Sequence, residues 1–428
     1  METLPVILMF VVLFGLIGLG LPIAFALLCA SLLPIVMEDR LTLLLVAQRT
    51  YNSLDSFLLL AIPFFLLAGN LMNTTGVTDR LIRFASALVG HLRGGMAQVD
   101  VTVSIMFAGI SGSSVADTAG SGTVLIPAQV KKGFPVEFAV AVTAASSVMG
   151  VIIPPSLLML VWGAVTETSI AALFISGIVP GLLIGIGQMI WVYCVSVHRG
   201  YPTEPWLGVR EIFASGYRAS AALLMPVIIV GGIRAGWFTP TEASITAVLY
   251  ALFLGFVLYR SLSLRELGSV MYESARLVSL SLFCVGTAGV FGFLLAYYKL
   301  PVLMAGITEF AYTPTLLLIA LTILFLILGT FLDGLVITII CAPLFLPAVN
   351  ALGIDPVHYG IVACIAIAMG LITPPYGLCL LIAASIGGIP MQKAFPDTFK
   401  LLGVMLIVLL AVILFPDIAL APVRWLGP

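Results

Sequence analysis

The chain has 428 residues, of which 61% are hydrophobic and 9% are charged, and its formal net charge is −1. Soluble domains carry about 25% charged residues, so the composition excludes a soluble globular protein and indicates a helical membrane protein with several spans. A nearly neutral chain has no basic surface for nucleic acid. The six cysteines lie in apolar runs without Cys-x-x-Cys spacing, which predicts buried thiols rather than disulfides or metal ligands.

The first quarter of the chain predicts spans and surface helices. Residues 5–36 form one long apolar segment that we expect to act as the insertion signal, and residues 56–73 form the next span. Residues 38–55 and 77–93 carry charges around apolar positions, which is typical of helices that lie along the membrane surface.

Two later apolar segments are interrupted by small polar residues. Residues 101–130 are interrupted at Ser111-Gly112-Ser113-Ser114 and at Gly120-Ser121-Gly122, and residues 314–350 break at Gly329-Thr330-Phe331-Leu332-Asp333-Gly334. Each half has about a dozen residues, whereas crossing the hydrocarbon core of a membrane takes about 20. The pattern therefore predicts two re-entrant hairpins.

Each predicted hairpin is followed by an apolar run with a Pro-Pro pair, in Gly150-Val151-Ile152-Ile153-Pro154-Pro155-Ser156 and in Gly370-Leu371-Ile372-Thr373-Pro374-Pro375-Tyr376. Proline removes an amide donor and disfavours helical backbone before it, so we expect each run to unwind at its centre. A single pair would most simply be a structural kink. The two motifs lie 220 positions apart, however, and the same offset aligns Gly109 with Gly329. The sequence thus predicts an internal duplication, and matching broken segments in two repeats point to a transporter's binding site.

Basic residues indicate how the repeats are oriented. Lys131 and Lys132 follow the first hairpin, whereas Asp355 and His358 stand at the corresponding place in the second. By the positive-inside rule, the first hairpin enters from the cytoplasm and the second from the opposite side. The predicted fold is therefore an all-α polytopic membrane protein built as an inverted repeat, with two re-entrant hairpins and two Pro-Pro broken helices. Further spans are predicted near 170–197, 219–233, 240–259, 277–297 and 401–421.

Two acidic residues stand alone in the hairpins. Asp117 is the only charged residue from Val101 to Val130, and Asp333 is the only one from Ala311 to Ile354. An acidic side chain at membrane depth costs at least about 2.5 kcal/mol on insertion scales and is a functional hypothesis by default. The competing interpretation is that each carboxylate caps a helix of its hairpin.

Hairpin tips and unwound helices expose carbonyl and hydroxyl oxygens, which suit a small hard cation such as Na⁺, and helix N-termini, which suit a carboxylate. The candidate cation ligands are Ser113, Ser114, Asp117, Gly150, Pro154, Gly329, Thr330, Asp333, Gly370 and Pro374. The candidate substrate-binding residues are Ser111, Gly112, Ser113, Ser156, Thr373 and Tyr376. Serines and glycines also allow close packing between membrane helices, which is the structural alternative.

Six stretches of the chain match the motifs of a known family, in the family's order and over most of the sequence: Ile62–Asn70, Phe107–Asp117, Ile153–Ser156, Phe238–Ala243, Asp355–Gly360 and Gly370–Pro375. At these stretches the chain resembles the large membrane subunit of the tripartite ATP-independent periplasmic (TRAP) transporters. The resemblance implies a secondary transporter of the bacterial inner membrane that imports an organic acid, such as a C4-dicarboxylate or sialic acid, with Na⁺ as the co-transported ion. It also implies a periplasmic substrate-binding protein and a small membrane subunit as partners.

The resemblance further implies an elevator-type motion, in which a transport domain slides against a scaffold. On this basis residues 96–168 and 314–392 form the two halves of the transport domain. The scaffold then consists of residues 1–95 with the interfacial helices, the central helices of 169–313 and a C-terminal helix in 393–428.

Two features depart from the family's pattern. Many relatives place an asparagine shortly before the second Gly-Leu-Ile-Thr-Pro-Pro, where this chain has Cys364–Met369, so an ion ligand at that place would be vacant or moved. No four-helix segment precedes residue 1, so we expect the small subunit to be a separate chain.

The residues leave two other functions open. One is an intramembrane aspartyl enzyme that uses Asp117 and Asp333, although the sequence has no readable catalytic motif around them. The other is a cation channel, which the inverted hairpins disfavour.

Overall fold

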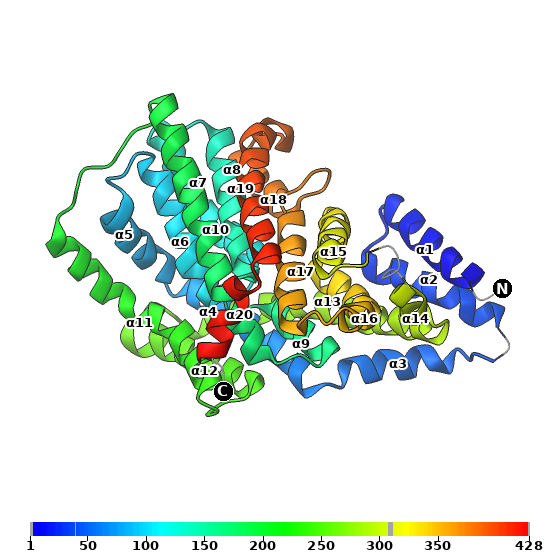
Figure 1. Ribbon diagram of the computed structural model, residues 1–428. Helices are drawn as coiled ribbons and strands as arrows, with labels where there is room; N and C mark the ends of the chain where they lie inside the picture. The colour runs from blue at the N-terminus through cyan, green and yellow to red at the C-terminus, as the bar shows by residue number, and fades with distance from the viewer. Residues whose placement is uncertain (1–2, 39, 307–310, 427–428) are drawn as a thin grey trace.

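The computed structural model describes residues 3–38, 40–306 and 311–426, and in these ranges every regular element is a helix (Figure 1). Seven helices in the described ranges are long and apolar enough to cross a membrane. This confirms the predicted all-α polytopic class. The N-terminal helices lie at one end of the molecule and α5 and α11 at the other, with the predicted hairpins and broken helices between them.

The N-terminal apolar segment is two helices, α1 (Thr3–Gly18) and α2 (Ile23–Met37), so the prediction of one long segment over residues 5–36 was wrong. Gly20 adopts a φ of +85°, which is open mainly to glycine, and Pro22 directly precedes α2. These two residues turn the chain, and α1 and α2 pack against each other. The following helix α3 (Leu44–Leu54) has no buried residue, and it packs along α13.

A short 3₁₀ turn (Phe57–Leu60) leads into α4 (Ala61–Thr74), where the second span was predicted. Helix α5 (Val77–Val89) covers the predicted surface segment. It buries Leu81 and Ala85, and it packs against α6 and α11.

The two hairpin segments break where the sequence predicts. Helices α6 (Gly95–Ser111) and α7 (Ser114–Lys131) meet at Gly112, which has a φ of +63°, and α15 (Pro314–Gly329) and α16 (Gly334–Ala351) meet at residues 330–333. The helices are 16 to 18 residues long rather than about a dozen. Helix α7 continues through Gly120-Ser121-Gly122, so the second interruption predicted in this segment was wrong, and α6 begins before the apolar stretch, at Gly95.

Both Pro-Pro runs are broken helices. The first consists of α8 (Val136–Ser147), a 3₁₀ turn (Val148–Val151) and α9 (Leu157–Thr166), and the second of α17 (Pro356–Gly370) and α18 (Leu378–Gly387). Both Pro-Pro bonds are cis. Helices α16 and α17 begin 220 positions after α7 and α8, so the helix boundaries repeat at the offset found in the sequence.

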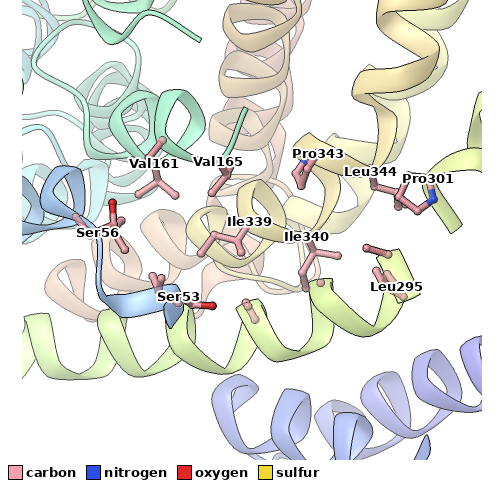
Figure 2. Close-up of a pocket in the computed structure, with 17 residues that line it drawn as sticks. Ser53, Ser56, Val161, Val165, Leu295, Pro301, Ile339, Ile340, Pro343 and Leu344 are labelled. Carbon is pink, nitrogen blue, oxygen red and sulfur yellow. The ribbon is translucent and has the colours of Figure 1, made fainter. Parts of the chain in front are cut away.

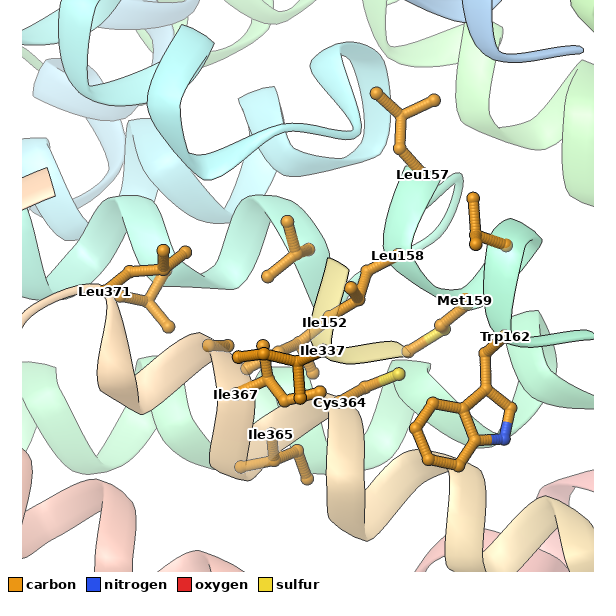
Figure 3. Close-up of a cluster of buried hydrophobic side chains, with 14 of the residues drawn as sticks. Ile152, Leu157, Leu158, Met159, Trp162, Ile337, Cys364, Ile365, Ile367 and Leu371 are labelled. Carbon is orange, nitrogen blue, oxygen red and sulfur yellow. The ribbon is translucent and has the colours of Figure 1, made fainter. Parts of the chain in front are cut away.

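Each half contacts the other through the helix that follows its Pro-Pro break. Helix α9 packs against α16 of the other half, and α18 packs against α7 and α8. Figure 3 shows the first of these contacts, where Leu158 of α9 lies near Ile337 of α16 and Ile367 of α17. The rings of Trp162 and Tyr359 lie edge to face with centroids 4.9 Å apart. Neither half therefore completes its own core.

The remaining helices surround this core: α10 (Ile170–Arg199), α11 (Val209–Arg234), α12 (Pro240–Phe253), α13 (Leu264–Tyr297), α14 (Leu300–Ala305), α19 (Phe395–Leu414) and α20 (Asp417–Leu426). The four predicted central spans correspond to α10–α13. The last predicted span, 401–421, corresponds to α19, which belongs to a candidate span. Its predicted end was wrong, because the chain leaves the helix at Phe415, directly before Pro416, and begins α20.

Candidate functional site

The first hairpin tip (residues 111–114) touches the first Pro-Pro break through backbone atoms. The amide of Leu157 donates to the carbonyl of Gly112 at 3.2 Å. A Cβ on Gly112 would lie 2.8 Å from the carbonyl oxygen of Pro155, and one on Gly150 would lie 3.1 Å from the carbonyl carbon of Ser113. The two glycines are therefore needed for this close approach.

The second hairpin tip (residues 329–334) meets its own break in the same manner. A Cβ on Gly370 would lie 2.5 Å from the Cα of Gly329, and one on Gly329 would lie 3.0 Å from the carbonyl oxygen of Ile367. Each half thus brings a hairpin tip against an unwound segment, as the paired motifs suggested.

The serines of the first half hold these segments in place. Ser113 and Ser156 are the N-cap residues of α7 and α9, and they accept from Ala116 N at 3.4 Å and Met159 N at 3.2 Å. Ser114 donates to the carbonyl of Val148 at 3.2 Å, and Ser156 donates to that of Val151 at 2.7 Å. Ser113 and Ser114 thus each make one structural hydrogen bond through the side chain, and Ser156 makes two.

Asp333 is the N-cap of α16, and its Oδ1 accepts from Leu335 N at 2.9 Å. Ser113 is the N-cap of α7, 220 positions earlier, so the two residues perform the same capping role in the two repeats. Asp333 is exposed, and it lines the cavity described next. The capping interpretation accounts for the bond at Oδ1, and the position of Asp333 at the cavity keeps the cation-ligand interpretation a prediction.

Both hairpin tips line one cavity of about 870 Å³, here called the large cavity. Among its polar lining residues are Ser113, Ser114 and Asp333 of the tips, together with Asn70, Asn73, Thr78, Asp79 and Ser281 of the surrounding helices. None of the described residues that line it is a lysine or an arginine. The structure thus assembles residues from both repeats around one space, whose largely apolar lining includes these polar groups and no positive side chain.

Several of these surrounding residues were not among the sequence candidates. Asn70 lies in α4 and donates from Nδ2 to Ser274 Oγ of α13 at 2.8 Å, and Asn73 accepts from Thr78 at 2.9 Å. Asn70 is the last residue of Ile62–Asn70, one of the stretches that match the family's motifs, so the sequence could have identified it as a candidate. Ser281 lies in a long apolar span, and no feature of the sequence marked it as a candidate.

Other predicted residues lie off the large cavity. Thr373 donates to the carbonyl of Met369 at 2.8 Å, and Tyr376 is 55% exposed, and neither lines this space. Thr330 donates to Ile327 O at 2.7 Å. The large cavity is also not lined by two residues of the tips, Ser111 and Gly329, or by the predicted ligands at the breaks, Gly150, Pro154, Gly370 and Pro374.

Asp117 is fully buried in α7, and within the described chain neither of its carboxylate oxygens has a hydrogen-bond partner. It does not line the large cavity, so the structure does not bring Asp117 and Asp333 together in one site. A second buried acid, Asp100 of α6, accepts from Gln129 Nε2 at 2.7 Å and from Thr143 Oγ1. Sequence analysis missed it because its partners are distant along the chain.

The donor set of the tips is oxygen-rich and poor in conventional metal ligands. In the part of the chain that the structure describes, no three His, Cys, Asp or Glu residues gather as a metal site would require. Hydroxyls, carbonyls and a single carboxylate are ligands for a weakly bound hard cation rather than for a transition metal.

Comparison with known families gives one match over nearly the whole chain. The family model described as "Tripartite ATP-independent periplasmic transporter, DctM component" matches residues 10–418.

Individual relatives agree with this match. The chain is 38% identical over 415 residues to the sialic acid TRAP transporter large permease protein SiaM of Vibrio cholerae, covering 96% of this chain and 97% of the relative. It is 40% identical over 382 residues to the C4-dicarboxylate TRAP transporter large permease protein DctM of Pseudomonas aeruginosa, covering 89% and 90%. It is 36% identical to the isethionate TRAP transporter permease protein DctMQ of Oleidesulfovibrio alaskensis, covering 97% of this chain and 66% of that one.

Two solved transporters share the fold at low sequence identity. The YdaH transporter of Alcanivorax borkumensis superposes with a TM-score of 0.64 at 15% identity, over 95% of this chain and 98% of that chain. MtrF of Neisseria gonorrhoeae superposes with a TM-score of 0.63 at 15% identity, over 87% and 85%. Both are similar in fold alone.

Proposed function

Because the chain belongs to the family of DctM components, the large permease subunits of TRAP transporters, we propose that it imports an organic acid together with Na⁺ by an elevator-type movement. The observation that carries this proposal is the meeting of both hairpin tips at the large cavity. When ligands from both repeats surround one space, the two tips and the site between them can move together relative to the scaffold. Alternating access of this kind keeps the site intact while it is exposed to either side.

The proposed Na⁺ ions bind at the contacts between tips and breaks. The backbone at Gly150, in the 3₁₀ turn, and at Gly370, where α17 ends, supplies carbonyls, and Ser113, Ser114 and Asp333 of the hairpin tips supply side-chain oxygens. The remaining predicted ligands, Asp117, Pro154, Gly329, Thr330 and Pro374, belong to the same segments and stay proposals.

The proposed substrate is a carboxylate. The names of the relatives include sialic acid and C4-dicarboxylate, which are both acids. The large cavity has no basic lining residue among those described, so a carboxylate there relies on co-bound cations and on helix N-termini. Ser114 and Gly334 begin α7 and α16 and both line the cavity, which places two such N-termini at it. This charge arrangement makes substrate binding depend on Na⁺.

A second, small cavity supports the elevator movement (Figure 2). Ile339, Ile340, Pro343 and Leu344 of α16 line it, and these are the counterparts, 220 positions on, of Ala119, Gly120, Thr123 and Val124 of α7, which line the large cavity. Helix α13 borders the large cavity at Leu277–Ser281 and the small one at Val285–Ala296. The two cavities are thus repeat-related spaces along one helix, and their unequal volumes of about 870 and 350 Å³ are what a transport domain at one end of its travel would give.

The proposed transport domain consists of residues 96–168 and 314–392, and the scaffold of residues 1–95, 169–313 and 393–428. The proposed partners are a periplasmic binding protein and a small membrane subunit, in the bacterial inner membrane. The name DctMQ and the extra length of that relative support the second partner, because this chain covers only 66% of it.

The test is uptake by proteoliposomes that hold the chain with its small subunit and are supplied with the binding protein. Radiolabelled sialic acid and succinate serve as substrates. Uptake of one of them is expected to require an inward Na⁺ gradient and to proceed without ATP. Uptake that is unchanged when K⁺ replaces Na⁺ at fixed pH would refute the coupling, and a steady current without the binding protein would indicate a channel.

A further inference from the structure

The small cavity has a volume of about 350 Å³ and an almost entirely apolar lining. Of its 17 lining residues only Ser53 and Ser56 have polar side chains. Figure 2 shows Val161 and Val165 of α9 on one side, Ile339 and Ile340 of α16 in the middle, and Leu295 of α13 on the other. Such a space does not hold water well, because water needs two to four polar partners.

Gly292 of α13 is the clearest sign that the space is kept open. A glycine inside a helix lowers stability by about 0.5–1 kcal/mol relative to alanine. Gly286 and Gly289 of the same helix have a packing reason, since a Cβ on either would press on α3 at Thr50 or Ser53. A Cβ on Gly292 would meet nothing within 4 Å, and Gly292 lines the cavity. Its missing side chain leaves room that no part of the described chain fills.

The surroundings of the cavity belong to the membrane. Helices α13 and α16, which form two of its walls, are both candidate spans. The lining residue Pro301 lies in α14, where the neighbouring Val302 and Leu303 are 69% and 52% exposed. Lys299 is exposed at the corner between α13 and α14, next to Tyr298, which donates to Glu38. An apolar cavity with charged and polar residues at the nearby turn between α13 and α14 matches the chemistry of a phospholipid, whose acyl chains are apolar and whose headgroup is charged.

We propose that the small cavity binds one acyl chain of a membrane phospholipid. A consequence for transport rests on the proposed function. The face of α16 that lines this cavity is the counterpart of the α7 face at the large cavity, so an elevator movement would have to expel the chain. The bound lipid then slows the movement of the second hairpin along α13, and this effect is here called the brake.

The binding test uses proteoliposomes of the chain with its small subunit, doped with a phosphatidylethanolamine that carries a diazirine within one acyl chain. After irradiation, labelled residues are expected on Val285–Ala296 and Ile339–Leu344. Gly292→Leu fills the space, and it should reduce this labelling about tenfold, since each displaced methylene weakens apolar binding about fourfold. Gly268→Leu is the matched control, because Gly268 lies in the same helix, also has open space around it and does not line the cavity.

Labelling spread evenly over exposed apolar faces such as that of α11, or unchanged in Gly292→Leu, would overturn the lipid site. Labelling in micelles that is lost in bilayers would assign the cavity to detergent and would also overturn it. If Gly292→Leu does not fold, Ile340→Phe fills the space from the opposite wall. Uptake by the same vesicles should fall in proportion to the labelled fraction, and unchanged uptake with strong labelling would overturn the brake while leaving the lipid site standing.

Discussion

Asp333 and Ser113 cap corresponding helices of the two repeats, but only Asp333 carries a charge. Replacing Asp333 by asparagine separates the two roles, because asparagine is as good an N-cap as aspartate. Losing a charge-assisted contact to a cation costs roughly 1.5–3 kcal/mol, which is about a 10- to 150-fold rise in half-maximal Na⁺. We expect Asp333→Asn to assemble normally and to show this rise in uptake assays.

Asp355→Asn is the matched control for that variant. Asp355 is the N-cap of α17 and accepts from Val357 N at 2.8 Å, the same capping geometry, but it does not line the large cavity. Its Na⁺ dependence should equal that of the unmodified chain. If Asp333→Asn also kept the original Na⁺ dependence while well assembled, Asp333 would leave the list of cation ligands.

Asp100 shows what residue-level sequence reasoning cannot reach. Asp333 could be predicted because it stands alone in a long uncharged run, whereas Asp100 depends on Gln129 and Thr143 from two other helices. The second repeat has Ala320, Val349 and Ala363 at the corresponding positions. The repeat pattern therefore gives no polar counterpart that would have drawn attention to the network.

That network predicts a stability effect. Gln129→Ala would leave Asp100 Oδ2 with one donor instead of two in a fully buried place, at a cost of about 1–3 kcal/mol. We expect a lower midpoint in thermal unfolding of the purified protein. Gln392→Ala, at an exposed glutamine, should leave the midpoint unchanged. Equal midpoints in the two variants would mean that the buried network contributes nothing to stability.

At the scale of elements, chain breaks were predictable where two signals coincided. The tips at 111–114 and 329–334 combine glycine with polar residues inside apolar runs, and the helices do end there. The break between α1 and α2 was missed because Gly20 and Pro22 occur in a run without polar residues, where each is also tolerated within a membrane helix. Helix lengths were underestimated because α7 continues through Gly120-Ser121-Gly122 and because α6 begins before Val101 and includes the buried Gln98.

The contact between tip and break gives a prediction for Gly370. Gly370→Ala would place a Cβ 2.5 Å from the backbone of Gly329, and overpacking of this kind costs typically 1–3 kcal/mol. We expect a lower unfolding midpoint and weaker Na⁺ protection against heat. Gly403→Ala, in a helix with open space around it, should raise the midpoint slightly. A Gly370→Ala protein as stable as Gly403→Ala would show that the two segments are not held in contact.

For the whole molecule, the inverted orientation of the repeats remains the main prediction from the sequence. The helix boundaries repeat at an offset of 220, which supports a duplication, but they do not say on which side of a membrane each hairpin begins. That inference rests on Lys131 and Lys132 after the first hairpin and Asp355 after the second. With helices of 16 to 18 residues, length alone no longer decides whether the hairpins turn back, so a direct measurement of sidedness is needed.

Lys132 and Asp355 are well placed for that measurement, since both are exposed at helix ends and neither lines a cavity. Single cysteines at these positions, in a chain from which the six native cysteines have been removed, are tested with a membrane-impermeant thiol reagent in oriented vesicles. The inverted repeat predicts that Lys132→Cys reacts only from the cytoplasmic side and Asp355→Cys only from the opposite side. Lys132 pairs with Glu204 at 2.9 Å, so Glu204→Cys provides an internal standard that must report the same side as Lys132→Cys. If all three cysteines react from one side, the two repeats are parallel rather than inverted.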